Sequence, residues 1–239
     1  MTGKEHRRSW LTGLLLAAVA VLALPGLGWA DAETETEPAT ATEPETYAGW
    51  RLRFQAASVD ISNDSGTTGQ GGTFDMDVGG GVGANAEYRF NRRLGIDLGV
   101  LAGAAVDLSV HSAQFGGATF LAHDTLAFTP WTVGLDVHLT PDSRVDLFFC
   151  PMLAWIHYGG VFVRTGPGGV AVSGIDIDDD LAPGAGLGLG VPFGSQRRWS
   201  FNANLTYLDS ELSGAGSGGY RVNDDHDLTM FGLGFGYRL

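Results

Sequence analysis

The sequence of 239 residues contains one cysteine, Cys150, and one lysine, Lys4. A single thiol cannot form an intrachain disulfide, so a disulfide-stapled fold is excluded. With no lysine after position 4, the rest of the chain cannot supply a P-loop lysine or a Schiff base. The shortage of basic residues also argues against nucleic acid as a partner, because binding to phosphates requires a basic patch.

Long apolar runs are missing too, with one exception at the start of the chain. Lys4 and Arg8 precede a nearly unbroken apolar stretch at 10–24, and small residues then lead to Ala30. About 15 apolar residues are fewer than the roughly 20 that a membrane-spanning helix needs. The pattern is typical of a secretory leader, so we expect 1–30 to be a signal peptide that is cleaved after Ala30.

The remaining chain would be strongly acidic. Cleavage would remove three of the 14 basic residues and one of the 27 acidic residues, which leaves 11 arginines against 26 carboxylates, a net charge of −15. Residues 31–46, DAETETEPATATEPET, contain no large apolar side chain and are predicted to form an acidic disordered periplasmic segment. No second apolar run near 20 residues follows, which excludes a bundle of membrane-spanning helices.

What the chain does contain is a regular alternation of large apolar residues with small or polar ones, with a period of two residues. The last nine residues, Phe231 to Leu239, place large apolar side chains at every odd position and Gly or Arg between them. Eight alternating stretches occur, near 47–61, 73–90, 94–110, 125–140, 144–161, 178–193, 198–212 and 226–239. Each is longer than the 9–11 residues with which a tilted strand crosses a bilayer. The sequence therefore predicts an all-β fold over 47–239, an eight-stranded antiparallel transmembrane β-barrel.

The connections alternate in length. Short turns are expected at 91–93, 141–143 and 194–197, and longer loops at 62–72, 111–124, 162–177 and 213–225. Short turns of outer-membrane barrels lie on the periplasmic side and long loops lie outside. We therefore expect an outer-membrane protein whose termini are both periplasmic.

The alternation also assigns the two faces of the wall. Large apolar residues such as Trp50, Trp131 and Phe201 would face lipid, and aromatic side chains near the short turns would form an interfacial girdle. The candidate lumen-lining residues are Arg51, Arg53, Glu87, Arg89, Asp97, Asp136, His138, Asp146, Asn202, Asn204 and Arg238. Their charges have both signs. Two interpretations remain open, a buried ion-pair network that holds the barrel closed and a selectivity ring for a permeant solute.

Glycines and carboxylates are each concentrated in one place. Glycine recurs at every second residue in 184–190 and 232–236, on the face expected to be lumenal. An eight-stranded barrel is about filled by ordinary side chains, so these glycines either leave space or relieve crowding in a curved wall. Carboxylates gather on the expected outer side, at 176–180, 209–211 and 224–227. A solvated face explains them, and divalent cations shared with lipopolysaccharide phosphates are the alternative.

Three stretches resemble a known family when taken in order. They are LAFTPWTVGLDVHLTP at 126–141, DLAPGAGLGLGV at 180–191 and WSFNANLTYLD at 199–209. Most of 47–239 is similar to the OmpW-like small outer-membrane barrels. The resemblance implies a narrow, largely hydrophobic passage for small apolar molecules, surrounded by outer-membrane lipid and lipopolysaccharide. It also implies insertion by the outer-membrane assembly machinery, although the chain ends in Leu239 where phenylalanine is usual.

The function expected from these patterns is a passage for small hydrophobic solutes in a monomeric barrel, with no cofactor, no metal ion and no nucleic acid. A structural or adhesive envelope barrel is the alternative. A lipid-modifying enzyme is less favoured. His157 lies in a stretch superficially similar to a lipid A deacylase strand, but Gly159 stands where that chemistry needs serine. We therefore expect no catalytic residue.

Overall fold

The computed structural model describes residues 48–62, 65–67, 73–115, 118–164, 171–216 and 221–239, and the regular elements among them are all β-strands. The strands are β1 (Gly49–Ser62), β2 (Ser65–Thr67), β3 (Thr73–Met76), β4 (Gly79–Arg89), β5 (Leu94–Phe115), β6 (Ala118–His138), β7 (Asp146–Tyr158), β8 (Val161–Arg164), β9 (Ala171–Ile177), β10 (Asp180–Phe193), β11 (Trp199–Gly216) and β12 (Arg221–Arg238). Among the described residues, no helix has the length and apolar character to cross a membrane. The expected signal peptide at 1–30 and acidic segment at 31–46 lie outside the described residues and stay predictions.

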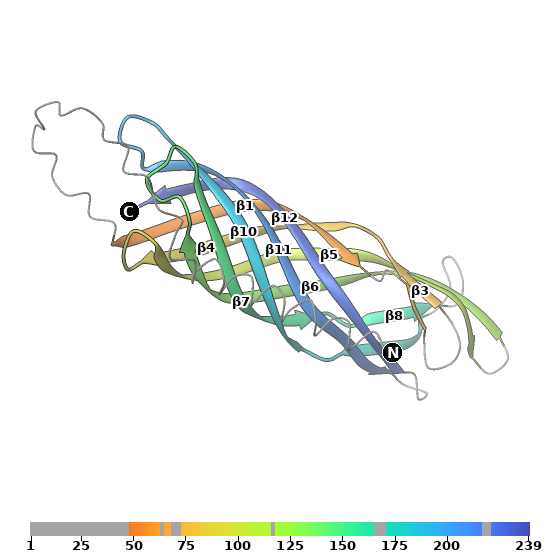
Figure 1. Cartoon of the computed structure of the whole chain (residues 1–239). Helices are drawn as coiled ribbons and strands as arrows, with labels where there is room; N and C mark the ends of the chain where they lie inside the picture. The colour runs from red at the N-terminus through yellow and green to blue at the C-terminus, as the bar shows by residue number, and fades with distance from the viewer. Residues whose placement is uncertain (1–47, 63–64, 68–72, 116–117, 165–170, 217–220) are drawn as a thin grey trace, which may run out of the picture. The chain divides into compact units, whose positions relative to one another are not determined.

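Eight long strands close into an antiparallel barrel in the order β1, β4, β5, β6, β7, β10, β11 and β12 (Figure 1). β12 completes the ring by pairing with β1, from Arg51 opposite Arg238 to Ser62 opposite Asp227. Closure removes the free edges that an open sheet would expose. The predicted closed eight-stranded antiparallel barrel is confirmed.

One end of the barrel holds the short connections. The β4–β5 turn is an Asx turn, in which the Asn91 side-chain oxygen accepts hydrogen bonds from the backbone N–H groups of Arg93 at 2.8 Å and Leu94 at 3.0 Å. The β10–β11 turn begins at Gly194, whose φ of 83° favours glycine. We call this end, with the connections at 90–93, 139–145 and 194–198 and the C-terminal Leu239, the turn end. The opposite end is called the loop end.

At the loop end, strands replace much of the chain that was expected to be loop. β5 and β6 continue to Phe115 and from Ala118, and β11 and β12 continue to Gly216 and from Arg221. The short strands β2 with β3, and β8 with β9, form two further hairpins there. The predicted loop boundaries at 62–72, 111–124, 162–177 and 213–225 were therefore wrong.

A belt of large apolar side chains surrounds the half of the barrel nearer the turn end. Trp50, Trp131 and Phe201 are among them, and each exposes 40% or more of its side chain. Aromatic rings meet near the turns, with ring centroids 4.8 Å apart for Trp199 and Tyr237. This arrangement agrees with the lipid-facing assignments and with an interfacial girdle at the turn end.

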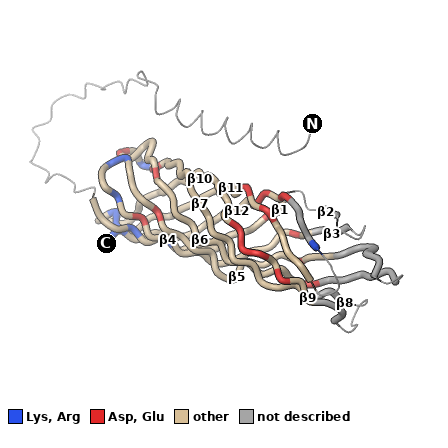
Figure 2. The backbone as a smooth tube through the Cα atoms, turned by 90° about the horizontal axis from the view of Figure 1, so that it is seen from below, with Lys and Arg blue, Asp and Glu red and all other residues tan. Residues whose placement is uncertain are grey.

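The polarity of the two faces exchanges halfway along the barrel. On β1, the inward face carries Arg53 and then Val59, whereas the outward face carries Phe54 and then Asp60. The loop half is therefore polar outside and apolar inside, as in a water-soluble barrel. In Figure 2, most arginines lie at the turn end, where carboxylates also lie, and further carboxylates follow the loop halves of strands that include β1, β11 and β12.

Candidate functional site

Buried charged side chains of both signs meet inside the barrel at the turn end. Arg53 Nη2 on β1 donates to Asp97 Oδ1 on β5 at 2.6 Å and to Asp136 Oδ2 on β6 at 2.7 Å. Asp97 Oδ2 also accepts a hydrogen bond from Asn85 on β4 at 2.8 Å. The Arg53 guanidinium lies 4.8 Å from the ring centroid of Phe148, which adds a cation–π contact. One guanidinium thus connects three strands directly.

A second group of charges lies next to the first. Arg89 Nε donates to Glu87 Oε1 at 2.8 Å, and Arg89 Nη2 contacts Asp146 Oδ2. His138 lies between these two carboxylates, with Nε2 2.8 Å from Glu87 Oε1 and Nδ1 3.0 Å from Asp146 Oδ1. Arg51 Nη1 is 3.6 Å from Asp146 and 3.9 Å from Glu87. These contacts are those of an ion-pair network.

The charges converge because inward positions on five neighbouring strands fall at one level of the barrel. The register places Glu87 opposite Arg51 on β1 and opposite Asp97 on β5. We call the whole cluster the ion network; it comprises Arg51, Arg53, Glu87, Arg89, Asp97, Asp136, His138 and Asp146. Breaking a buried ion pair by removing one partner costs about 3–5 kcal/mol. The ion network therefore acts as a cross-link between β1, β4, β5, β6 and β7.

The other three predicted lumen residues lie outside the ion network. Asn202 and Asn204 on β11 line a cavity next to it. Arg238 on β12 is half-buried at the turn end, opposite Arg51 in the β1–β12 register. There it borders a small hollow together with Arg51 and Arg89. The structure thus brings eight of the predicted residues into one cluster and places three beside it.

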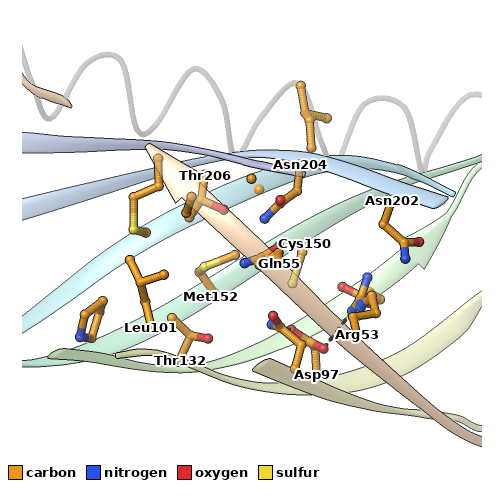
Figure 3. A pocket seen from close by; sticks show the side chains of 18 of the residues that line it. Arg53, Gln55, Asp97, Leu101, Thr132, Cys150, Met152, Asn202, Asn204 and Thr206 are labelled. Carbon is orange, nitrogen blue, oxygen red and sulfur yellow. Dashed lines mark hydrogen bonds and ion pairs between the residues drawn. The ribbon is translucent and has the colours of Figure 1, made fainter. Parts of the chain in front are cut away.

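A cavity of about 60 Å³ lies inside the barrel, on the side of the ion network nearer the loop end (Figure 3). Arg53, Asp97 and Asp136 form its charged floor. Its remaining lining mixes polar side chains with apolar ones, and includes Gln55, Asn85, Thr132, Asn202, Asn204, Thr206, Leu101, Met152 and Met230. A cavity must offer about 10–15 Å³ to hold one buried water molecule. The cavity therefore has room for a few water molecules or for the end of a small solute.

Several inward glycines make room for polar side chains on neighbouring strands. Gln55 lies opposite Gly83 on β4 and opposite Gly234 on β12, and a Cβ at Gly83 would lie 3.0 Å from the Gln55 side chain. Gly186 and Gly232 both border the cavity. A Cβ at Gly232 would overlap the Asn204 side chain, whereas a Cβ at Gly186 would lie 3.0 Å from the nearest atom, Met152 Cε at the end of a flexible side chain. Space for a side chain therefore exists at Gly186.

Toward the loop end, apolar side chains fill the lumen. Val59, Leu126, Ile156, Leu208 and Leu228 are completely buried there, within a core that the inward faces of the loop half share. Because this core is continuous across the barrel, it closes the loop end of the cavity in the same way that the ion network closes the turn end.

A small polar cluster inside this apolar core was missed by sequence reasoning. Tyr158 Oη lies 2.8 Å from Ser210 Oγ and 3.3 Å from His226 Nε2, and Ser210 Oγ donates to Asp180 Oδ2 at 2.8 Å. The signal was available, because Ser210 and His226 share the inward face with Leu208 and Leu228. Ser210, His226 and Tyr158 are all buried inside the loop-end half of the barrel.

A groove of about 350 Å³ lies on the lipid side of the wall, over β7, β10, β11 and β12. Its lining is almost entirely apolar and includes Leu147, Leu187, Leu189, Leu205 and Phe231. Phe148, Leu187 and Asn204 line both this groove and the internal cavity. Behind the groove, a Cβ at Gly188 would overlap the Phe148 ring. At that point, the wall consists of a glycine backbone and one aromatic ring.

Two groups of buried side chains have the donor atoms of a metal site. They are Glu87, Asp136 and His138, and Asp97, Asp136 and Cys150, with the donor atoms of each group within 4.8 Å of one another. Arg53 bonds to both aspartates, and its positive charge competes with a metal ion for the same oxygens. The donor set therefore fits a metal poorly, and the expectation of no metal ion stays a prediction.

His157 lies on the outward face, near the loop end of β7. Its side chain is exposed, and Nδ1 lies 2.7 Å from Asp179 Oδ1. Gly159 offers only its backbone there, and its N–H donates to the carbonyl oxygen of Ala127. No hydroxyl nucleophile is supplied by these positions, and the expectation of no catalytic residue stays a prediction.

A closed barrel with an apolar belt outside and a polar interior is the architecture of an outer-membrane barrel protein. The family model described as "Outer membrane protein beta-barrel domain" matches residues 14–238, and the chain belongs to this family. This family assignment supports the expected location in the outer membrane.

Solved structures share the fold at low sequence identity. OprG from Pseudomonas aeruginosa is 16% identical, with a TM-score of 0.62 over 81% of this chain and 97% of that one. AlkL, determined in lipid bilayers, is 17% identical, with a TM-score of 0.58 over 86% and 96% of the two chains. At the level of the fold, the expected resemblance to small outer-membrane barrels of the OmpW-like type is thereby confirmed. No curated protein sequence matches the chain.

Proposed function

We propose that the barrel is a narrow passage for small, largely hydrophobic solutes, which exchange between the internal cavity and the surrounding lipid. The observation that carries this proposal is the wall that the cavity and the lipid-side groove share, formed by Phe148, Leu187 and Asn204. A rotation of the Phe148 ring away from Gly188 would join the two spaces without breaking a strand pair, because no hydrogen bond of the barrel depends on that ring.

The ion network supports exchange through the side of the barrel rather than through its turn end. Opening the turn end would separate buried charges such as Arg53 and Asp136, at about 3–5 kcal/mol for each broken pair. Opening the loop end would instead separate packed apolar side chains such as Leu208 and Leu228, together with the hydrogen bonds of Tyr158. A solute would therefore enter past the loop-end core or from lipid, and leave past Phe148.

The orientation and the surroundings of the barrel belong to the same proposal. The turn end would face the periplasm and the loop end the outside, since short turns and chain termini are periplasmic in such barrels. Lipid and lipopolysaccharide would contact the apolar belt, and the chain would be inserted as a monomer by the outer-membrane assembly machinery.

Uptake of a labelled solute tests the proposal. Vesicles with a lipopolysaccharide outer leaflet resist entry of toluene, so wild-type protein should accelerate its uptake several-fold over protein-free vesicles. Gly186→Leu should abolish most of that gain, because the new side chain fills the cavity next to Met152. Phe148→Ala should increase it by thinning the shared wall.

Ala56→Leu serves as the matched control, because it adds an aliphatic side chain to the exposed lipid face of β1 and leaves the cavity unchanged. Different gel mobility of boiled and unboiled samples shows that each variant is folded. Equal uptake in vesicles with and without the protein would contradict the proposal and favour a structural or adhesive barrel.

A further inference from the structure

Arginines surround the turn end of the barrel. Each of the three short connections there contains at least one arginine, and β12 ends on another (Figure 2). We call these six residues the arginine rim; they are Arg92 and Arg93 between β4 and β5, Arg144 between β6 and β7, Arg197 and Arg198 between β10 and β11, and Arg238. The strand order distributes these positions around the whole circumference of the barrel.

The described part of the turn end keeps a positive net charge when the ion network is included. Together with Arg51, Arg53 and Arg89, the arginine rim brings nine guanidinium groups to this end. The carboxylates there are six, those of Glu87, Asp97, Asp136, Asp142, Asp146 and the terminal group of Leu239. Nine against six leaves +3 with neutral His138 and +4 with protonated His138. A surface with this charge attracts anions in either case.

Two arginines of the rim lie on neighbouring strands beside a pair of aromatic rings. The backbone N–H of Arg238 donates to the carbonyl oxygen of Arg198 at 2.8 Å. The next residues toward the apolar belt, Trp199 and Tyr237, face each other across β11 and β12 with ring centroids 4.8 Å apart. Trp199 is 50% exposed on the lipid face. Interfacial aromatic rings mark the level of the lipid headgroups, so these arginines lie at the level of the lipid phosphates.

The guanidinium groups of the β10–β11 turn are available to a ligand. Arg197 and Arg198 are both exposed, and neither forms an ion pair within the part of the chain that the structure describes. Arg92 differs, because it pairs with Asp142 on the surface. A guanidinium group binds phosphate oxygens through two parallel N–H donors, which makes arginine a strong phosphate ligand. The turn therefore offers two such groups next to the aromatic pair.

We propose that Arg197, Arg198 and Arg238 bind the phosphate of an anionic phospholipid, whose glycerol and upper acyl chains lie against Trp199 and Tyr237. The rings continue the site from the arginines into the apolar belt, which fits a lipid and not a soluble phosphate. The positive net charge of the turn end favours a lipid with a net negative charge, such as phosphatidylglycerol, over zwitterionic phosphatidylcholine. In the proposed orientation, this end meets the phospholipid leaflet of the outer membrane. The site is independent of the proposed passage, because it needs neither the cavity nor the groove.

Quenching of tryptophan fluorescence by brominated lipids measures which lipid lies beside a given ring. Two single-tryptophan proteins are compared, one that keeps Trp199 and one that keeps Trp155, with the other tryptophans replaced by phenylalanine. Trp155 is exposed to lipid on β7, further toward the loop end, and serves as the internal reference. Phosphatidylcholine vesicles contain a small, equal fraction of brominated phosphatidylglycerol or brominated phosphatidylcholine. At low ionic strength, phosphatidylglycerol should associate with Trp199 at least threefold more strongly than phosphatidylcholine, and Trp155 should show no preference.

Arg197→Gln/Arg198→Gln should reduce the preference at Trp199 to near one, because it removes two guanidinium groups and keeps polar side chains. Arg221→Gln is the control, because Arg221 is an exposed arginine at the loop end of β12, and it should leave the preference unchanged. Different gel mobility of boiled and unboiled samples shows that each variant is folded.

An unchanged preference in the double variant, or equal preferences at Trp199 and Trp155, would overturn the proposal. Inorganic phosphate is then added to the wild type at constant ionic strength. Loss of the phosphatidylglycerol preference at millimolar phosphate would also overturn the proposal and would assign the arginines to a soluble anion, whereas retention of the preference supports the lipid.

Discussion

At the scale of single residues, Arg53 contributes most to holding the interior of the barrel together. Its guanidinium contacts Asp97, Asp136 and the ring of Phe148, and it also lies 3.9 Å from Glu87. The side chain is 8% exposed, so water cannot replace these partners. Removing Arg53 would leave carboxylates from three strands facing one another.

Arg53→Ala should therefore destabilise the barrel by about 3–5 kcal/mol, the usual cost of breaking a buried pair. Arg92→Ala is the matched control, because Arg92 pairs with Asp142 on the surface, where both side chains are about half exposed. An exposed pair contributes about 0–1 kcal/mol. Denaturant unfolding in lipid vesicles measures the free energy of unfolding of both variants. Equal losses of this free energy would show that the ion network is not a stabilising cross-link.

The sequence predicted which residues face the lumen but not which of them meet. Alternation alone places Arg53 and Asp136 inward, since it depends only on position along one strand. The pairing of Arg53 with Asp136 depends on the stagger between β1 and β6, which are not neighbours in the sheet. The lumenal glycines indicated that space could remain inside the barrel, but the position and lining of the cavity were beyond prediction for the same reason, because the cavity is the space left after side chains from eight strands pack.

At the scale of strands, the exchange of inside and outside polarity explains the wrong loop boundaries. The alternation continues past the lipid on β5, β6, β11 and β12, but polar residues move to the outer face and apolar ones to the inner face. A prediction that expects apolar residues on the outer face along the whole strand therefore ends the strands too early. The length of the strands beyond the belt is what provides the closed apolar core at the loop end.

The two inward glycines Gly234 and Gly186 should respond differently to the same change. At Gly234, a Cβ would overlap the backbone carbonyl oxygen of Phe54 on β1, and the backbone cannot yield as a side chain can. Gly234→Ala should therefore disrupt the β1–β12 seam and prevent folding into the heat-modifiable form. Gly186→Ala should fold normally, because its neighbours are mobile side chains. Normal folding of Gly234→Ala would show that the seam is looser than the register implies.

At the scale of the whole molecule, the two ends of the barrel differ in the length of their strands and connections, in charge, and in the side chains that close the lumen. The turn end has short connections and a cross-linked ion network, and the loop end has long strands and an apolar core. This asymmetry predicts the orientation in the membrane.

Cysteine labelling on intact cells tests that orientation. A membrane-impermeant maleimide should label Asp60→Cys and Thr125→Cys, which are exposed near the loop end, and should not label Asn91→Cys or Ser195→Cys in the turns. The native Cys150 is buried and gives little background. The opposite labelling pattern would place the turn end outside.

Ion conductance across planar bilayers tests most directly the claim that solutes leave through the wall while the turn end stays closed. Wild-type protein should show no sustained conductance, because the ion network and the loop-end core seal the lumen. Glu87→Ala/Arg89→Ala opens the turn end only and should still not conduct, whereas the same pair combined with Leu208→Ala and Leu228→Ala opens both seals and should conduct. Sustained conductance of the wild type, equal to that of the fourfold variant, would contradict the account.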